Sequence, residues 1–207
     1  MQITTREKVL DTAQSMFNER GVEYVGIREI ATALDMRVGN LTYYFPTKDH
    51  LIATLARRLR ELNNQTVVVK DGMTMLEFLE MNRKVFQNQS QHVYLFKSFV
   101  HLFEKHEEIA TSYKRTEKAR FNVLRKILDE LAENKFLLQL GNEQLEFLKY
   151  SISFINRFWQ SEAAITFRNL SLKKQQYHYL EMIGRLLVPY STAKGKKEIE
   201  KFICTLK

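Results

Sequence analysis

Cysteine, proline and glycine are all scarce in this chain of 207 residues. Cys204 is the single cysteine, so no disulfide can form within the chain, and a reducing compartment suits it. Two prolines and seven glycines are too few for the many turns of a sheet protein, and this scarcity favours long helices joined by short loops. No stretch approaches about 18 apolar residues, and the opening segment MQITTREKVL lacks the apolar core of a signal peptide. We therefore expect a helical, cytoplasmic protein without a membrane-spanning segment.

The composition is that of a folded, basic protein. Hydrophobic residues make up 44% of the chain, which excludes general disorder, and the length suits one globular domain or two small domains that share a core. The formal net charge of +8 suits a polyanionic partner without identifying it. Residues 1–60 carry nine Lys or Arg against seven Asp or Glu, so most of the positive charge lies further along the chain. A nucleic-acid site must therefore be argued from a motif.

Hydrophobic periodicity and capping residues divide the chain into helices. Thr4 and Glu7 fit a capping box, and Thr47, Asn142 and Ser171 are placed to cap later helices. Gly21 is placed to end the first helix, and Pro189 ends a later one. The predicted helices cover about residues 5–20, 27–34, 38–45, 48–64, 74–88, 91–105, 107–133, 142–168, 171–188 and 199–206. Residues 65–73 interrupt the pattern and mark a boundary between segments. The prediction is an all-α fold with nine or ten helices.

Residues 26–51, GIREIATALDMRVGNLTYYFPTKDHL, contain the most informative pattern: a short helix, a tight turn, a second short helix and the start of a third. A helix-turn-helix uses its first helix to hold the second against the major groove of DNA, so the second helix needs one apolar edge and a different face for DNA. Leu41 and Phe45, spaced i, i+4, supply the apolar edge. Because three adjacent helical residues cannot share a face, Tyr43 and Tyr44 are left for another role.

The remaining residues of the second helix suit contacts with DNA. Gly39 would let the backbone approach closely, Asn40 can pair with the edge of adenine, and Val38 can lie against a thymine methyl group. The hydroxyls of Thr42 and Tyr44 suit phosphates. Lys48, at the exposed start of the next helix, adds a cation to its free backbone amides. The pattern therefore predicts a helix that reads DNA.

Residues 5–51 resemble the N-terminal domain of TetR/AcrR-type bacterial transcriptional regulators. The resemblance rests on the apolar positions of the first helix up to Phe17 and Gly21, on Ile30-Ala31, and on Gly39-x-Leu41-x-x-Tyr44-Phe45-x-x-Lys48-x-x-Leu51. It implies base contacts from Arg28, Val38, Gly39, Asn40 and Tyr43, and phosphate contacts from Thr42, Tyr44 and Lys48. It also implies a helical C-terminal effector domain and a homodimer.

Four positions depart from the family pattern. Val25-Gly26 replaces the usual Ser or Thr before the second helix, and Asp35 replaces the usual glycine of the turn. Arg37 replaces a small hydroxyl residue and could add a phosphate or guanine contact, or be a solvated charge like Arg28. Thr42 replaces a tyrosine. These changes bear on the operator sequence more than on DNA binding itself.

In regulators of this type the last two long helices pair with their copies, which here implies a homodimer through about residues 143–168 and 172–188. Apolar stripes run along both predicted helices: Leu145, Leu148, Ile152, Ile155, Trp159 and Ala163 on the first, and Tyr179, Met182, Ile183, Leu186 and Leu187 on the second. Gly184 would permit close helix approach. Because a two-fold dimer holds its reading helices about one DNA turn apart or a multiple of it, we expect an inverted-repeat operator.

Aromatic residues of the C-terminal part are candidates for an effector pocket, although such residues could equally be ordinary core. The candidates are Phe86, Phe99, Phe103, Phe121, Phe154, Phe158 and Trp159. Asn156 and Gln160 could orient a ligand, or face solvent or the dimer partner. The pattern does not identify the effector.

Other classes of function find less support. His101 and His106 are five residues apart, which misses the i, i+3 or i+4 spacing of shared metal ligands. No phosphate-binding glycine loop or nucleophile motif occurs, so we expect no catalysis, no metal site and no cofactor. The basic tail KGKKEIEKFICTLK could lie on an anionic membrane, but a packed terminal helix suits it better.

The sequence therefore predicts a sequence-specific DNA-binding transcriptional regulator: a homodimeric repressor released from an inverted-repeat operator by a small apolar or amphipathic ligand. Residues 1–48 would form the three-helix helix-turn-helix domain, and residues 49–207 the helical ligand-binding and dimerisation domain. The alternative is a DNA-binding protein of the same fold that organises the chromosome or controls division at many sites.

Overall fold

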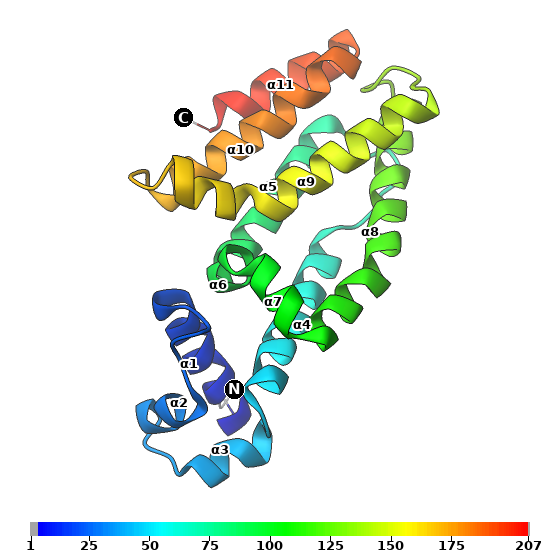
Figure 1. The fold of residues 1–207 in the computed structure, drawn as a ribbon. Coiled ribbons are helices and arrows are strands. Elements are labelled where there is room, and N and C mark those ends of the chain that lie inside the picture. Colours follow the sequence, from blue (N-terminus) through cyan, green and yellow to red (C-terminus); the bar gives the residue numbers. More distant parts are fainter. Residues whose placement is uncertain (1–3, 207) are drawn as a thin grey trace. The chain divides into compact units, whose positions relative to one another are not determined.

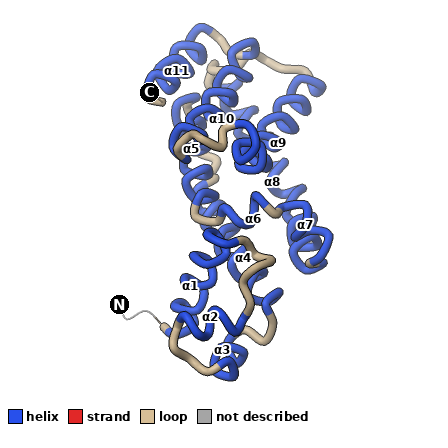
Figure 2. Tube along the Cα trace, turned by 60° about the vertical axis from the view of Figure 1, so that its left-hand side comes forward, coloured by secondary structure: helices blue, strands red, loops and turns tan. Residues whose placement is uncertain are grey.

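The computed structural model describes residues 4–206, and within them the chain is helical without a strand (Figures 1 and 2). Eleven α-helices and one 3-10 helix make up this part of the chain. Their bounds are α1 Thr5–Arg20, α2 Ile27–Ala33, α3 Val38–Tyr44, α4 Lys48–Thr66, α5 Met75–Ser90, α6 Val93–Lys97, α7 Phe99–Lys105, α8 Glu107–Glu133, α9 Asn142–Thr166, α10 Leu172–Leu187, η1 Val188–Tyr190 and α11 Ala193–Cys204. The all-α prediction is confirmed.

The eleventh helix arises where one segment, predicted as a single helix over residues 91–105, is divided at Ser98. The Ser98 N–H still donates to the Tyr94 carbonyl at 3.1 Å, and the Ser98 carbonyl accepts from the Leu102 N–H at 2.8 Å. The break is therefore a change of direction between α6 and α7 in which both backbone groups of Ser98 remain paired. Hydrophobic periodicity cannot reveal such a bend, because both pieces bury apolar residues.

The capping residues mostly act as predicted. Thr4 accepts from the Glu7 N–H at 3.2 Å, and Gly21, at φ +90°, ends α1. Thr47 accepts from the His50 N–H at 3.1 Å and so caps α4. The capping residue of α9 is Gly141 rather than Asn142, because the Gly141 N–H donates to the Gln144 side chain at 3.0 Å.

The helices form two compact units, each with its own core. Unit 1 comprises residues up to Leu62 together with Asn88–Ser112, and unit 2 comprises Asn63–Gln87 and Tyr113 onward. The core of unit 1 gathers the apolar residues of α1 to α4 with Tyr94, Leu95, Phe96, Leu102 and Ile109. A segment some 70 residues further along the chain thus completes the core around the helix-turn-helix.

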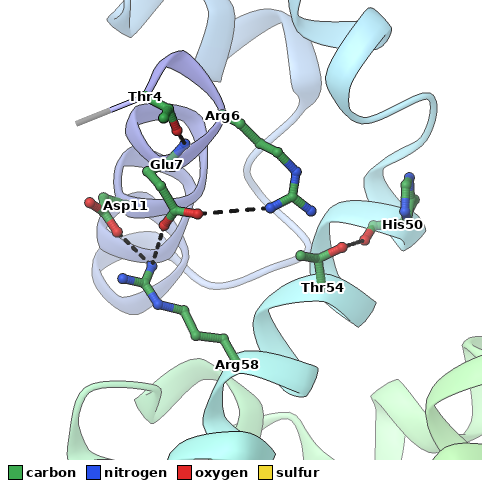
Figure 3. A network of polar contacts seen from close by, with 7 residues as sticks. All are labelled: Thr4, Arg6, Glu7, Asp11, His50, Thr54 and Arg58. Atoms are coloured by element: carbon green, nitrogen blue, oxygen red, sulfur yellow. Dashed lines mark hydrogen bonds and ion pairs between the residues drawn. The ribbon is translucent and has the colours of Figure 1, made fainter. Parts of the chain in front are cut away.

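Polar contacts fix the helices of unit 1 against one another. Arg58 of α4 lies 2.7 Å from Asp11 and 3.7 Å from Glu7 on α1 (Figure 3). The Gln14 and Asn18 side chains of α1 both donate to the Gln91 carbonyl at 2.8 Å. The Arg58 ion pairs are exposed and each contributes little alone. The amides orient α6, whose Tyr94 ring packs 5.4 Å from Phe17.

In unit 2, α10 packs against both α9 and α11 (Figure 1). Gly184 serves the α10–α11 contact, since a Cβ there would already lie 3.4 Å from the Ile199 side chain. The close helix approach predicted at Gly184 is therefore made to α11 of the same chain. Ile199 and Phe202 are fully buried, so the C-terminal tail is a packed helix and not a free amphipathic one.

The apolar stripe predicted to pair α9 with its copy is also used inside unit 2. Leu145, Leu148, Ile152, Trp159 and Ala163 are all buried in the core, as are Tyr179, Ile183 and Leu187 of α10. A residue already enclosed by its own chain cannot contact a second copy. Any dimer through these helices must use a different face of them.

Candidate nucleic-acid interface

The supporting helix α2 is held at its start by a carboxylate. The Gly26 N–H donates to Glu29 Oε2 at 2.8 Å, and Arg20 lies 2.6 Å from Glu29 Oε1. The hydrogen bond from the Gly26 N–H lowers the pKa of Glu29 most, and the hydrogen bond from Arg20 lowers it further. Arg20 also donates to the Tyr24 carbonyl at 3.0 Å, so one guanidinium joins the end of α1 to the entry of α2.

The turn between α2 and α3 contains a left-handed residue. Asp35 has φ 49°, a region that glycine enters easily and that Asp tolerates better than most other residues. The Met36 N–H donates to the Ala31 carbonyl at 3.0 Å and closes the turn. Asp35 therefore adopts the conformation expected of the glycine it replaces.

Helix α3 has a buried edge and an exposed face. Leu41 and Phe45 are fully buried in unit 1, which confirms the predicted inner edge. The exposed residues are Arg37, Val38, Gly39, Asn40 and Tyr43, with Arg28 of α2 also exposed. Tyr43 is 82% exposed, so it does not pack in the core of unit 1. The Tyr43 and Tyr44 rings lie edge to face, with their centroids 5.3 Å apart. Thr42 and Tyr44 are partly buried, and the Thr42 hydroxyl donates to the Gly39 carbonyl at 3.2 Å.

Nothing in the fold requires a glycine at position 39. A Cβ built on Gly39 would meet no atom within 4 Å, and its φ is not positive. Glycine in a helix lowers stability relative to alanine, so its presence on this exposed face needs another cause. Close approach of another molecule to the α3 backbone is such a cause.

Lys48 is partly buried at the start of α4, where the sequence suggested an exposed cation. Burial lowers the pKa of Lys48, and this shift is opposed by Glu23, Asp49 and Glu29. The ammonium thus faces three carboxylates while it remains accessible to an anion. A phosphate at this position would add to their effect.

Two family models match the chain in succession. The model described as "Bacterial regulatory proteins, tetR family" matches residues 9–55, and the model described as "Bacterial transcriptional repressor" matches residues 52–199. The second match alone spans more than half of the chain. The chain belongs to the TetR family.

Individual proteins agree with this assignment. A probable HTH-type transcriptional regulator of Bacillus subtilis (strain 168), YttP, is 26% identical over 153 residues, which cover 72% of this chain and 70% of that protein. The HTH-type transcriptional repressor KstR of Rhodococcus jostii (strain RHA1) is 34% identical over 61 residues, or 29% of each chain. The crystal structure of a TetR-family transcriptional regulator from Marinobacter aquaeolei VT8 superposes with a TM-score of 0.90 at 16% identity, covering 99% of this chain and 100% of that one.

These matches establish the class of function. The TetR-family chain is a DNA-binding transcriptional regulator and not an enzyme, and regulators of this family are dimers. Within residues 4–206, no helix is both long enough and apolar enough to cross a membrane. In the same residues, no three His, Cys, Asp or Glu side chains are grouped so as to hold a metal ion.

Sequence reasoning did not single out Tyr24, an exposed aromatic residue of this TetR-family chain. Tyr24 lies in the loop between α1 and α2 and is largely exposed, while its carbonyl is held by Arg20. The available signal was a tyrosine in a short loop that directly precedes the supporting helix.

The residues predicted to line an effector pocket lie in separate pairs. Phe99 and Phe103 stack on α7 in unit 1, with ring centroids 4.3 Å apart. Phe86 and Trp159 stack at 4.7 Å in the core of unit 2. Phe154 contacts Phe158 at 5.1 Å, and Phe121 contacts Tyr150 at 5.0 Å.

An open pocket of about 680 Å³ lies between α8, α9 and α10 in unit 2. Two of the predicted residues, Phe121 and Phe154, line it together with Tyr150, Met182 and Leu186. Arg157 and Arg185 also line it, and they pair with Glu117 at 3.1 Å and with Glu181 respectively. The lining is therefore mainly apolar, and each of its two arginines is paired with a carboxylate.

Proposed function

We propose that this TetR-family chain is a homodimeric repressor that reads an inverted-repeat operator through α3 and its surroundings. The base contacts are assigned to Arg28, Val38, Gly39, Asn40 and Tyr43, and the phosphate contacts to Thr42, Tyr44 and Lys48, with Arg37 on a phosphate or a guanine. The observation that carries this assignment is the division of α3 into a fully buried edge at Leu41 and Phe45 and an exposed face at Asn40 and Tyr43.

The exposed apolar face of α9 is proposed as the dimer contact. Phe147, Tyr150 and Phe154 follow one another at i, i+3 and i+7, and they are 52%, 61% and 64% exposed. Met182, on the neighbouring helix α10, is also exposed. A contiguous patch of large apolar side chains is rare on a monomer and marks an interaction surface. A second copy pairing α9 and α10 isologously would cover the patch and the pocket beside it.

Release of DNA follows from a ligand that binds one conformation of the dimer better than another. If residues 49–207 form the ligand-binding and dimerisation domain, a small apolar or amphipathic ligand there can favour a conformation in which the two helix-turn-helix domains, residues 1–48, are wrongly spaced for the operator. We expect such a DNA-binding regulator to act in the cytoplasm, with the chromosome.

The proposal is tested by two substitutions that should fail differently on a DNA fragment selected from a random pool. Asn40→Ala should lose about 1–3 kcal/mol on the selected sequence and relax the preference at one base position. Lys48→Ala should weaken binding to selected and random DNA alike. It should also reduce the slope of the logarithm of the binding constant against the logarithm of the salt concentration by about 1. Binding curves for both DNAs over a salt series measure these effects. If neither substitution changes binding, α3 is not the reading helix.

A further inference from the structure

The inner face of α9 carries amides in the core of unit 2, among residues that are otherwise apolar. Asn156 donates to the Asn82 side chain of α5 at 3.2 Å, and the Asn82 amide donates to the Phe78 carbonyl at 2.8 Å. Gln160 lies one turn further along α9 on the same face. The Trp159 ring beside it stacks on Phe86, with centroids 4.7 Å apart.

Gln160 is buried without hydrogen bonds. Gln160 is only 4% exposed, and neither its Nε2 nor its Oε1 has a hydrogen-bond partner among the described residues. The hydroxyl of Tyr179, whose ring lies 6.0 Å from that of Trp159, is also buried without a partner. Burying a donor or an acceptor without a partner lowers stability, and nearly all such groups in folded proteins are paired. A core that only had to pack would be more stable with an apolar residue at position 160.

The chemistry of this site restricts what could pair with it. A glutamine amide presents an NH2 donor group and a carbonyl acceptor side by side, so its complement is a group that both accepts and donates. Among the described residues, the buried polar side chains of unit 2 are Asn82, Gln160 and Ser191, none of which is charged. An ionised group would find no opposite charge among these three side chains, and its burial would carry a large desolvation cost.

We infer that Gln160 is the hydrogen-bonding anchor of an effector site in the core of unit 2, and that it takes a neutral, mainly apolar molecule bearing a carboxamide-like group. The apolar part of the molecule packs among the aromatic residues around Phe86 and Trp159. Because this core is packed, entry of the molecule requires unit 2 to rearrange. The molecule therefore binds the rearranged conformation better than the packed one, and this difference in affinity is what release of DNA needs. The inference rests on the proposed ligand-released repressor and names the ligand class of that site.

Trp159 gives a direct readout, because it is the only tryptophan of the chain and stacks in this core. Octanamide serves as the probe, with octanoate and octylammonium as charged molecules of equal chain length. Titration of the full-length protein with octanamide should change the Trp159 emission and raise the Tm, whereas the two charged molecules should do neither. An emission change of equal size with octanoate would show a merely hydrophobic cavity and would overturn the inference.

The matched variant is Gln160→Met, which keeps the length and volume of the side chain while removing both hydrogen-bonding groups. Without probe, its Tm should rise by about 2–6 °C, because an unpaired amide has been removed. Its octanamide titration should need at least about tenfold more probe. Gln175→Leu is the control: Gln175 donates to the Phe167 and Leu170 carbonyls, so its loss should lower the Tm and leave the titration unchanged.

Operator binding separates this inference from the proposed function. Without probe, Gln160→Met should bind operator DNA within about twofold of the unmodified protein, since it leaves α3 intact. If Gln160→Met lowers the Tm and keeps the octanamide response, the amide is a structural group held by water and the inference fails while the DNA-binding proposal stands. If the variant does not fold, Gln160→Leu replaces it, and failure of both to fold would equally show that the amide is required by the core.

Discussion

Replacing Gly39 by alanine should separate the needs of the fold from the needs of DNA binding. A Cβ at this position meets no atom within 4 Å, so no packing is lost. Gly39 lies in the first turn of α3, where alanine is the better helix former, and we expect the free energy of unfolding to rise by roughly 0.5–1 kcal/mol. For a chain of this size the Tm should rise by about 1–4 °C. Calorimetry measures this effect.

The same methyl group should lower the affinity for DNA. If the α3 backbone approaches the major groove at Gly39, an added Cβ holds it away, and we expect a loss of at least about tenfold, or about 1.4 kcal/mol, in fluorescence anisotropy with operator DNA. Gly72→Ala is the matched control, because Gly72 has φ +72° and lies outside the helix-turn-helix. It should lose stability and keep its affinity for DNA. An unchanged affinity in Gly39→Ala would refute the assigned approach of α3, and a lowered Tm would refute the reasoning about packing.

Three further outcomes follow from the structure. Burial lowers the pKa of His92 from 6.5 to about 4, so between these values the unfolded chain binds a proton that the folded chain does not; the free energy of unfolding should fall by up to about 3 kcal/mol as the pH drops, and His92→Leu should flatten this loss in urea titrations. In Gly195→Ala, the new Cβ would lie 2.1 Å from the Phe136 carbonyl oxygen, so chemical denaturation should show a loss of about 1–3 kcal/mol, and an unchanged midpoint would mean that this contact is looser than it appears. Phe154→Lys should give a monomer at micromolar concentration in sedimentation analysis, and a persistent dimer would exclude the exposed face of α9 as the contact.

Local signals account for most of the fold. Capping residues such as Thr4, Thr47 and Ser171 act as predicted. Apolar periodicity located the α-helices, although it merged α6 with α7 and began α11 at residue 199 rather than at Ala193. The division at Ser98 and the return of residues 88–112 to the core of unit 1 could not be predicted, because both depend on contacts between residues far apart in the chain.

The exposed face of α3 could also be predicted from local signals. On a two-turn helix with one buried edge, burial of Leu41 and Phe45 leaves few alternatives for Asn40 and Tyr43. The partial burial of Lys48 among carboxylates could not be predicted, since only the tertiary fold brings Glu23 and Glu29 near it.

The apolar face of α9 shows where periodicity fails. Both Leu148 and its neighbour Phe147 belong to apolar stripes at helical spacing, and one stripe is buried while the other is exposed. A sequence with two apolar faces on one helix does not say which face its own chain covers. The stripe that includes Leu148 was therefore assigned to the dimer, although it is buried, and we propose the exposed stripe with Phe147 and Phe154 for the contact instead.

Selection of bound sequences from random DNA, carried out with the unmodified protein and with Asn40→Ala in parallel, tests the central claim most directly. The account predicts an enriched inverted repeat for the unmodified protein, with half-sites about one DNA turn apart or a multiple of it. It also predicts that Asn40→Ala selects the same repeat with one position in each half-site relaxed. Binding without enrichment, falling steeply with salt, would contradict sequence-specific recognition, because phosphate contacts alone carry no sequence information. That result would favour a protein that organises the chromosome at many sites.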